Sequence, residues 1–208
     1  VQRDYDQTAI VATVHAEGML AGRAFERFTS EGPLALLPQD DGYSLVWCMR
    51  PDNAEAMLDL KDDAFLEALQ QAFGHRVGRF IRTGVRHAYA LGLNADPDAT
   101  ARSVAIGNAA QTLHPVAGQG LNLGLRDAAV LARLLARDAT PDALAQFQRQ
   151  RTADRGATVR LTDLMARVFA SSADGTLTQD LLGASLGMID VFPPAKRALA
   201  EQMMFGVR

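Results

Sequence analysis

The feature that most constrains this chain is a glycine-rich stretch, Gly118-Gln119-Gly120, at the start of a predicted helix. Upstream, the apolar run Val104–Ile106 ends at Gly107-Asn108, which predicts a buried strand that stops where backbone approaches another group. A helix that starts this way directs unpaired N–H groups and partial positive charge at whatever lies above it. Apolar residues recur downstream at spacings of three and four, which predicts a buried helix face made of Leu121, Leu125, Ala128, Ala132 and Leu135.

Two common phosphate-binding motifs fit this stretch poorly. Gly118, Gly120 and Gly124 have near-Rossmann spacing, but a Rossmann turn places its glycines directly after the strand, and here about ten residues intervene. A P-loop requires a Lys-Ser or Lys-Thr pair, and none follows these glycines. A plain dinucleotide site and a tight helix start without a ligand stay open as minor alternatives.

The combined motif resembles the second flavin-binding motif of the FAD-dependent aromatic hydroxylases. The residues that carry the resemblance are Gly107-Asn108-Ala109-Ala110, His114-Pro115 and Gly118-Gln119-Gly120-Leu121-Asn122. Within the family, the stretch is most similar to the ubiquinone-biosynthesis branch, and most of all to the 2-polyprenyl-6-methoxyphenol hydroxylases. Asn108 and Gln111 replace the Asp and His of the common family form, and both departures resemble that branch.

The resemblance implies FAD as the cofactor, with NAD(P)H as reductant. The amides around Gly120 would face the pyrimidine edge of the flavin ring, where a helix end is worth up to about 2 kcal/mol to an anion. Asn108 would accept a hydrogen bond from the ribityl chain through an uncharged oxygen. The flavin itself carries the chemistry, so we expect no catalytic side chain. The expected cofactor-binding residues are Gly107, Asn108, Pro115, Gly118, Gln119, Gly120, Leu121 and Asn122.

Three aromatic or imidazole side chains are candidates for the substrate pocket: Phe28, Trp47 and His114. Core packing explains Phe28 and Trp47 equally well. For His114, which precedes a proline in a tight loop, a local hydrogen-bonding role is favoured over proton transfer. Four arginines of the later helical region are interpreted as a solvated face: Arg149, Arg151, Arg155 and Arg160.

Composition excludes several other classes of function. The 208 residues are 48% apolar and 22% charged, as in globular proteins, and the net charge of −3 gives no electrostatic case for nucleic-acid binding. Cys48 is the one cysteine, which fits a reducing cytosol, and no metal-ligand spacing appears. No apolar run approaches the ~18 residues of a transmembrane helix. We therefore expect a cytoplasmic protein, with peripheral membrane contact or contact with a ubiquinone-synthesis complex as further expectations from the resemblance.

The pattern of elements predicts an α+β fold. Short β-rich segments separated by turn residues indicate an antiparallel sheet, which the resemblance assigns to substrate binding. We expect three parts: residues 1–100 as the substrate-domain sheet and its helices, 101–138 as the strand-loop-helix flavin motif, and 139–208 as a helical tail. The expected strands are Thr8–His15, Ala24–Thr29, Pro33–Leu37, Tyr43–Met49 and Arg102–Ile106, with extended chain over Phe80–Leu91; the expected helices are Asp52–Leu60, Asp62–Phe73, one from Pro141 to about Ala170, Leu177–Asp190 and one from Pro193.

The chain begins at Val1 and enters a strand pattern almost at once. Together with the resemblance, this leads us to expect the C-terminal part of a larger enzyme, without its N-terminal ADP-binding unit. Alone, it would be inactive and would self-associate through an apolar surface. The whole enzyme would hydroxylate a polyprenylated phenol in ubiquinone synthesis with FAD, NAD(P)H and O2. Two alternatives stay open: a family member acting on another aromatic substrate, and an assembly module that has lost flavin binding.

Overall fold

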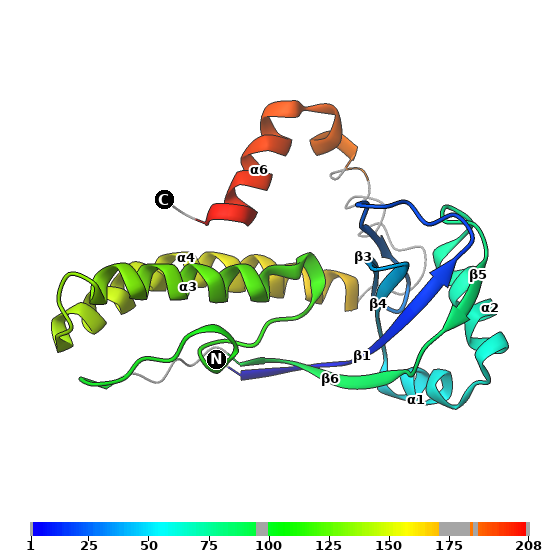
Figure 1. Ribbon diagram of the computed structural model, residues 1–208, viewed down its shortest axis with the longest axis horizontal. Coiled ribbons are helices and arrows are strands. Elements are labelled where there is room, and N and C mark those ends of the chain that lie inside the picture. Colours follow the sequence, from blue (N-terminus) through cyan, green and yellow to red (C-terminus); the bar gives the residue numbers. More distant parts are fainter. Residues whose placement is uncertain (1, 95–99, 171–183, 185–186, 207–208) are drawn as a thin grey trace. The chain divides into compact units, whose positions relative to one another are not determined.

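The computed structural model describes residues 2–94, 100–170, 184 and 187–206, and its α+β architecture confirms the predicted fold class (Figure 1). The sequence also predicts a loop over Asn94–Asp98 and a helix break at Ser171–Gly175. Residues 95–98 and 171–175 lie outside the described residues, as does most of the predicted helix Leu177–Asp190. The chain divides into two compact units, each described by itself. The first unit comprises 1–4, 92–168 and 175–208, and the second comprises 5–91 and 169–174.

The second unit is built on an antiparallel sheet. Its order is β2-β3-β4-β1-β5, and β6 pairs with β1 off this path. Short turns join β3 to β4 and place Leu36 opposite Leu45, while Ile10 of β1 lies opposite Trp47 of β4. The strands are β1 (Gln2–Ala16), β2 (Phe25–Phe28), β3 (Pro33–Gln39), β4 (Gly42–Met49), β5 (Phe80–Thr83) and β6 (His87–Asn94).

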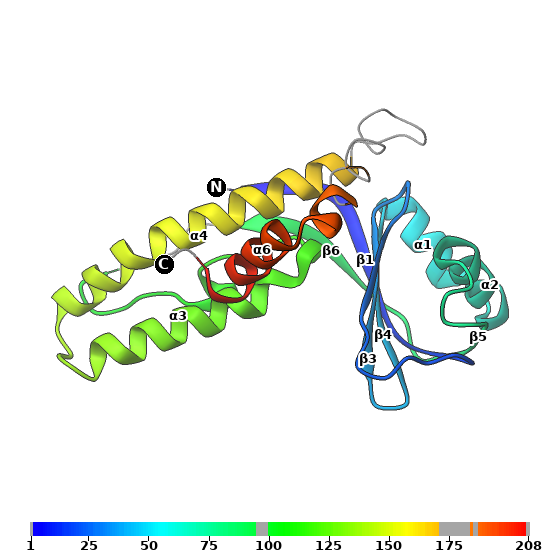
Figure 2. The ribbon, with the colours of Figure 1, turned by 90° about the horizontal axis from the view of Figure 1, so that it is seen from above.

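Two helices, α1 (Pro51–Asp59) and α2 (Asp62–Phe73), cover one face of this sheet (Figure 2). Acidic residues occupy the first turn of each, where the helix dipole favours negative charge. Gly74 ends α2 with φ of 87°, a conformation that glycine adopts without steric penalty. Alternation along the strands and helical spacing along α2 send apolar side chains into one shared core: Ile10, Val14, Leu34, Leu36, Tyr43, Leu45, Trp47, Met49, Phe65, Leu69 and Phe73 among others.

The first unit is mainly helical. Helices α3 (Gln119–Leu135) and α4 (Pro141–Ala170) run antiparallel, and Leu134, Ala143 and Phe147 form the small apolar cluster between them (Figure 2). Helix α6 (Pro193–Phe205) begins at the proline expected from the sequence and contacts α3. Two short 3-10 turns, η1 (Gly107–Ala109) and η2 (Val116–Gly118), lie ahead of α3.

Two expectations about this unit are wrong. Arg102–Ile106 is extended at Ile106, with φ −133° and ψ 160°, but it forms no named strand, because only Val104 takes part in an isolated β-bridge and no continuous ladder follows. The predicted buried face of α3 is exposed: Leu121 is 73% exposed and Leu125 is 60% exposed. Helix α3 instead buries Leu123, Asp127 and Leu134, because its contacts with α4 depend on charged as well as apolar side chains.

Candidate functional site

The segment ahead of α3 begins with a tight turn at Gly107. This residue has φ of +59°, and its carbonyl accepts hydrogen bonds from the N–H groups of Ala110 and Gln111, both at 3.0 Å. A Cβ added to Gly124 of α3 would lie 3.4 Å from the Cα of Gly107. The two glycines therefore let the turn pack closely against the helix. The side chain of Asn108, at the tip of the turn, is exposed.

The segment then reaches the N-terminal end of α3, the part of the helix whose first N–H groups have no helical acceptor. Gly118 is the N-cap residue, with φ of 59°, and it offers no side chain to those N–H groups. A Cβ added at Gly118 or at Gly120 would meet nothing within 4 Å. The helix start is therefore uncapped and open among the described residues, with room for a ligand to approach the backbone.

His114 is a structural residue of this segment. Its side chain is 1% exposed, and its Nδ1 accepts a hydrogen bond from the N–H of Val116 at 3.1 Å. Burial lowers the pKa of His114 to about 4, so the ring is neutral near pH 7. The local hydrogen-bonding role predicted from the sequence is confirmed.

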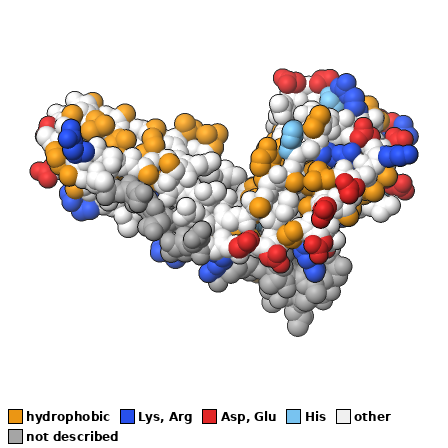
Figure 3. Space-filling view, turned by 90° about the horizontal axis from the view of Figure 1, so that it is seen from below, with side chains coloured by type: hydrophobic (Ala, Val, Ile, Leu, Met, Phe, Trp, Pro, Cys, Tyr) orange, Lys and Arg blue, Asp and Glu red, His pale blue; other side chains and the backbone are white. Residues whose placement is uncertain are grey.

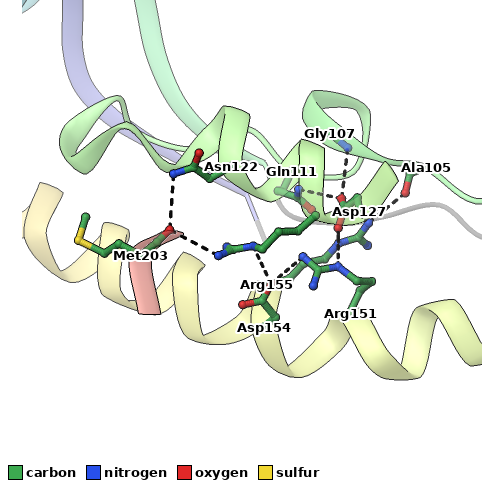
Figure 4. Close-up of polar contacts among 10 residues, drawn as sticks. Ala105, Gly107, Gln111, Asn122, Asp127, Arg151, Asp154, Arg155 and Met203 are labelled. Carbon is green, nitrogen blue, oxygen red and sulfur yellow. Dashed lines mark hydrogen bonds and ion pairs between the residues drawn. The ribbon is translucent and has the colours of Figure 1, made fainter. Parts of the chain in front are cut away.

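A buried carboxylate holds the turn from the side of α3 (Figure 4). Asp127 is fully buried, and its Oδ2 accepts the N–H of Gly107 at 3.3 Å and the Nε2 of Gln111 at 3.4 Å. Two guanidinium groups of α4 neutralise it: Arg151 Nε lies 2.7 Å from Oδ1, and Arg155 NH2 lies 2.8 Å from Oδ2. We call Asp127, Arg151 and Arg155 the ionic cluster.

The charge of Asp127 depends on these arginines. Burial by itself would raise the pKa of this carboxyl group, but hydrogen bonds and positive charge from Arg155 and Arg151 outweigh burial and lower the pKa. Because the pKa is lower in the folded state, the ion pairs stabilise the fold above the ordinary Asp value of about 3.9. That contribution is lost as the pH falls through the lowered pKa.

The C-terminal helix contacts the same region. Asn122 Nδ2 and Arg126 NH1 both lie 3.5 Å from the backbone carbonyl oxygen of Met203 in α6. Asp154 of α4 pairs with Arg126 at 3.2 Å and with Arg151 at 2.6 Å. The side chain of Asn122 therefore contacts α6, and only the backbone of Asn122 is available for the flavin contact expected from the sequence.

The chain is similar to known proteins in sequence and in fold. A family model described as "FAD binding domain" matches residues 4–162, more than half of the 208 residues. The chain belongs to the FAD-binding domain family. The resemblance to the FAD-dependent hydroxylases, and to their ubiquinone branch, is confirmed.

Relatives and solved structures agree with this membership. The chain is 36% identical to "Ubiquinone hydroxylase UbiL" of Rhodospirillum rubrum, over 96% of this chain and 48% of the relative. It is 31% identical to human "Ubiquinone biosynthesis monooxygenase COQ6, mitochondrial", over 83% of this chain and 46% of the relative. The chain thus spans about half the length of the curated relatives it matches.

Two solved structures have a similar fold. PqsL of P. aeruginosa in complex with 2-aminobenzoylacetate has a TM-score of 0.66 at 26% identity, covering 82% of this chain and 50% of that one. The Diels-Alderase PyrE3 of pyrroindomycin biosynthesis has a TM-score of 0.69 at 19% identity, covering 99% and 45%, and this likeness concerns the fold alone.

Three observations test whether the residues of this FAD-binding family member fit the cofactor. The uncapped start of α3 offers N–H donors, and Gly118 and Gly120 leave space above them. The Oε1 of Gln111 is buried without a hydrogen-bond partner among the described residues, an arrangement that costs about 1–3 kcal/mol unless a donor is supplied. FAD carries a partner for each of these groups. Its ring has hydrogen-bond acceptors for the N–H donors of α3, and its ribityl chain has hydroxyl donors for the Oε1 of Gln111. The residues present therefore fit the cofactor.

The structure separates the proposed pocket residues. Pairing of Arg27 with Leu34, and of Leu34 with Trp47, puts these three side chains on one face of the sheet. That is the helix-covered face, where Trp47 is 5% exposed and packs 6.2 Å from the ring of Phe65. Phe28, one residue beyond Arg27, lies on the opposite face and is half-buried. Phe28 and Trp47 therefore cannot line one cavity over either face, and core packing accounts for Trp47.

Sequence reasoning missed the ionic cluster. Arg151 and Arg155 were expected on a solvated face, but they are 5% and 8% exposed and bind Asp127. Arg149 and Arg160 are exposed, as expected. One signal was available in the sequence. Asp127 is the one acidic residue of α3, and two arginines spaced by four residues on the next helix lie on one helix face, so that both can meet one carboxylate.

Apolar side chains are also gathered at the surface of the first unit, shown in orange at the left of Figure 3. The exposed apolar residues of this unit include Leu121, Leu125, Leu164, Met204 and Phe205. Among the described residues, no helix is both long and apolar enough to cross a membrane.

Proposed function

We propose that this chain provides the substrate sheet and the second flavin contact of an FAD-dependent monooxygenase of ubiquinone synthesis. The observation that carries the proposal is the open, uncapped start of α3, bordered by Gly118 and Gly120. The names of the relatives UbiL and COQ6 support the pathway. The proposed substrate is a polyprenylated phenol, and NAD(P)H and O2 complete the reaction.

In this proposal the protein binds FAD and the substrate, orients them relative to each other and excludes water from the site. When bound, FAD supplies the redox chemistry that activates O2. The first-turn amides of α3, at Gly120, Leu121 and Asn122, would hold the pyrimidine edge of the ring, because N–H donors and the helix dipole favour negative charge there. Asn108 would accept a hydrogen bond from the ribityl chain, and Pro115 would form a wall that presents no N–H to the ring.

The full-length protein tests this function. We expect it to purify with the absorbance of bound FAD, and we expect prenylated phenols to stimulate its NAD(P)H oxidation and to gain one oxygen atom by mass spectrometry. The 208-residue chain should show no turnover. An intact protein that retains no flavin would support the assembly-module alternative, and a preference for unprenylated aromatics would support the alternative substrate.

A matched pair of variants tests the helix start directly. Gly120→Val puts a branched side chain into the open space above the first turn, and we expect FAD affinity to fall strongly. Ala129→Val introduces the same β-branched side chain on the exposed surface of the same helix, away from its first turn. Equal FAD affinity in the two variants would place the flavin elsewhere.

A further inference from the structure

The ionic cluster makes hydrogen bonds to the Gly107 turn at three positions. On one side, Arg155 NH2 donates to the carbonyl oxygen of Ala105 at 3.1 Å. At its centre, the N–H of Gly107 donates to Asp127, and beyond the turn the side chain of Gln111 donates to the same carboxylate oxygen. Figure 4 shows the contacts at positions 105, 107 and 111. These positions lie on both sides of Asn108 in the chain, and the side chain of Asn108 is exposed.

The cluster is itself held rigidly. Arg155 binds Asp127 through both Nε, at 3.3 Å, and NH2, and its guanidinium lies 5.4 Å from the ring centre of Phe147. Arg151 is shared between Asp127 and Asp154. A planar guanidinium group with several fixed partners has little freedom to rotate. The carboxylate of Asp127, which accepts the hydrogen bonds from the Gly107 turn, is therefore held in one orientation.

Stability alone explains such a cluster poorly. Taking three charged groups out of water is costly, and well-packed apolar side chains of similar volume often stabilise a protein as well or better. Hydrogen bonds to a buried charge differ from apolar contacts in being directional. The cluster is thus suited to fixing the position of backbone, which apolar packing does less strictly.

We propose that Asp127, Arg151 and Arg155 are positioning residues that hold the Gly107–Gln111 turn so that Asn108 meets the ribityl chain of FAD. The inference deepens the proposed function and rests on it. The cluster itself does not touch the cofactor: it acts through the backbone of Gly107 and through Gln111. Small displacements of a binding group weaken its contacts, so a loosened turn would bind FAD less tightly and in a less uniform environment.

The test compares three variants of the full-length protein. Asp127→Asn removes the negative charge, and Arg155→Lys keeps the positive charge but loses the fork that reaches Asp127 and Ala105. Asp163→Asn is the matched control, because Asp163 is a buried carboxylate of the same helix α4, eight residues beyond Arg155, and pairs with the partly exposed Arg3 at 2.6 Å. For each variant we would measure the FAD dissociation constant, the flavin midpoint potential and the visible absorbance.

We expect the FAD dissociation constant of Arg155→Lys to rise about tenfold, with a larger rise for Asp127→Asn, as for loss of a hydrogen bond to a charged group. The absorbance and potential of the bound flavin should shift in both. Asp163→Asn should lose stability while its FAD affinity and potential stay at the wild-type values. The inference would be overturned if Asp127→Asn and Arg155→Lys lost stability as Asp163→Asn does but kept the wild-type FAD affinity and flavin midpoint potential.

Amide hydrogen exchange separates this inference from the proposed function. Without flavin, exchange over residues 105–111 should speed up in Asp127→Asn and Arg155→Lys but not in Asp163→Asn. Unchanged exchange in the first two would overturn the positioning role whatever the protein binds. If exchange speeds up in these variants but the protein does not bind FAD, the cluster positions the turn as inferred. Its proposed role in FAD binding would then be refuted, together with the proposed function.

Discussion

The two units of this protein are stabilised in different ways. The second unit has a continuous apolar core between its sheet and helices α1 and α2, formed by side chains such as Leu36, Tyr43 and Phe65 that are fully buried. Among the described residues of the first unit, an apolar cluster of Leu134, Ala143 and Phe147 lies between α3 and α4, and four charged side chains are buried as well: Asp127, Arg151, Asp154 and Arg155.

This contrast relates to what each unit has to do. Apolar burial is nondirectional and tolerates rearrangement as long as volume and pattern are kept, which suits a sheet that serves as a platform. Charge-assisted hydrogen bonds fix both distance and direction, which suits a turn that has to present its backbone to a ligand. The difference predicts that the two units will respond differently to the same kinds of substitution.

The largest effect should come from Asp127→Ala. Removing one partner of a buried ion pair leaves two buried guanidinium groups short of negative charge, and we expect a loss of about 4 kcal/mol in the free energy of unfolding. Urea denaturation followed by far-UV circular dichroism would measure it. Replacing all three members, as Asp127→Leu, Arg151→Leu and Arg155→Met, should recover most of this stability; a triple variant as unstable as the single one would show that apolar packing cannot substitute.

In the second unit, Leu36→Ala should lower the free energy of unfolding by about 3 kcal/mol through a cavity in the apolar core. Trp47 is the only tryptophan and lies in the same core, so its fluorescence reports unfolding of this unit. Leu37→Ala on the same strand is the control, because Leu37 is 45% exposed and its loss should change stability little. Similar losses for the two leucines would contradict the assigned faces of the sheet.

Acid should weaken the first unit through His114. Its pKa is about 4 in the folded protein and about 6.5 when unfolded, so the unfolded chain binds more protons between these values. Stability should therefore fall by about 2 kcal/mol from pH 7 to pH 5. His114→Asn keeps an acceptor for the N–H of Val116 but does not titrate in this range. Urea midpoints at the two pH values should differ less in this variant; an equal difference would show that another group is responsible.

The smallest effect on stability should come from the exposed face of α3. Leu121→Gln and Leu125→Gln together should leave the free energy of unfolding within about 0.5 kcal/mol, because both side chains face solvent in this chain. We expect light scattering to show self-association of the 208-residue chain and a shift toward monomer in the double variant. Ile81→Gln, an exposed position of the second unit, serves as control. A strictly monomeric parent chain would refute the expectation.

The second unit was largely predictable from sequence. The expected strands that correspond to β2, β3 and β4 and the two expected helices were confirmed to within about two residues, because alternation and turn residues are local signals, whereas β1 begins at Gln2, six residues before the expected Thr8. In the first unit, α4 and the start of α6 at Pro193 were also confirmed. The errors concentrate at Arg102–Ile106 and at the apolar stripe of α3, where periodicity indicates that a face is apolar but does not identify what covers it.

The sequence by itself determined the family, through the residues from Gly107 to Asn122. A motif that binds a ligand through its backbone requires glycines at particular positions, and their spacing can be recognised along the chain. It also determined the apolar core of the sheet. Only the tertiary structure placed Arg151 and Arg155 against Asp127, since whether an arginine meets solvent or a buried carboxylate depends on how α3 and α4 pack. The same packing decided that Trp47 and Phe28 lie on opposite faces, because strand pairing fixes the face of each side chain.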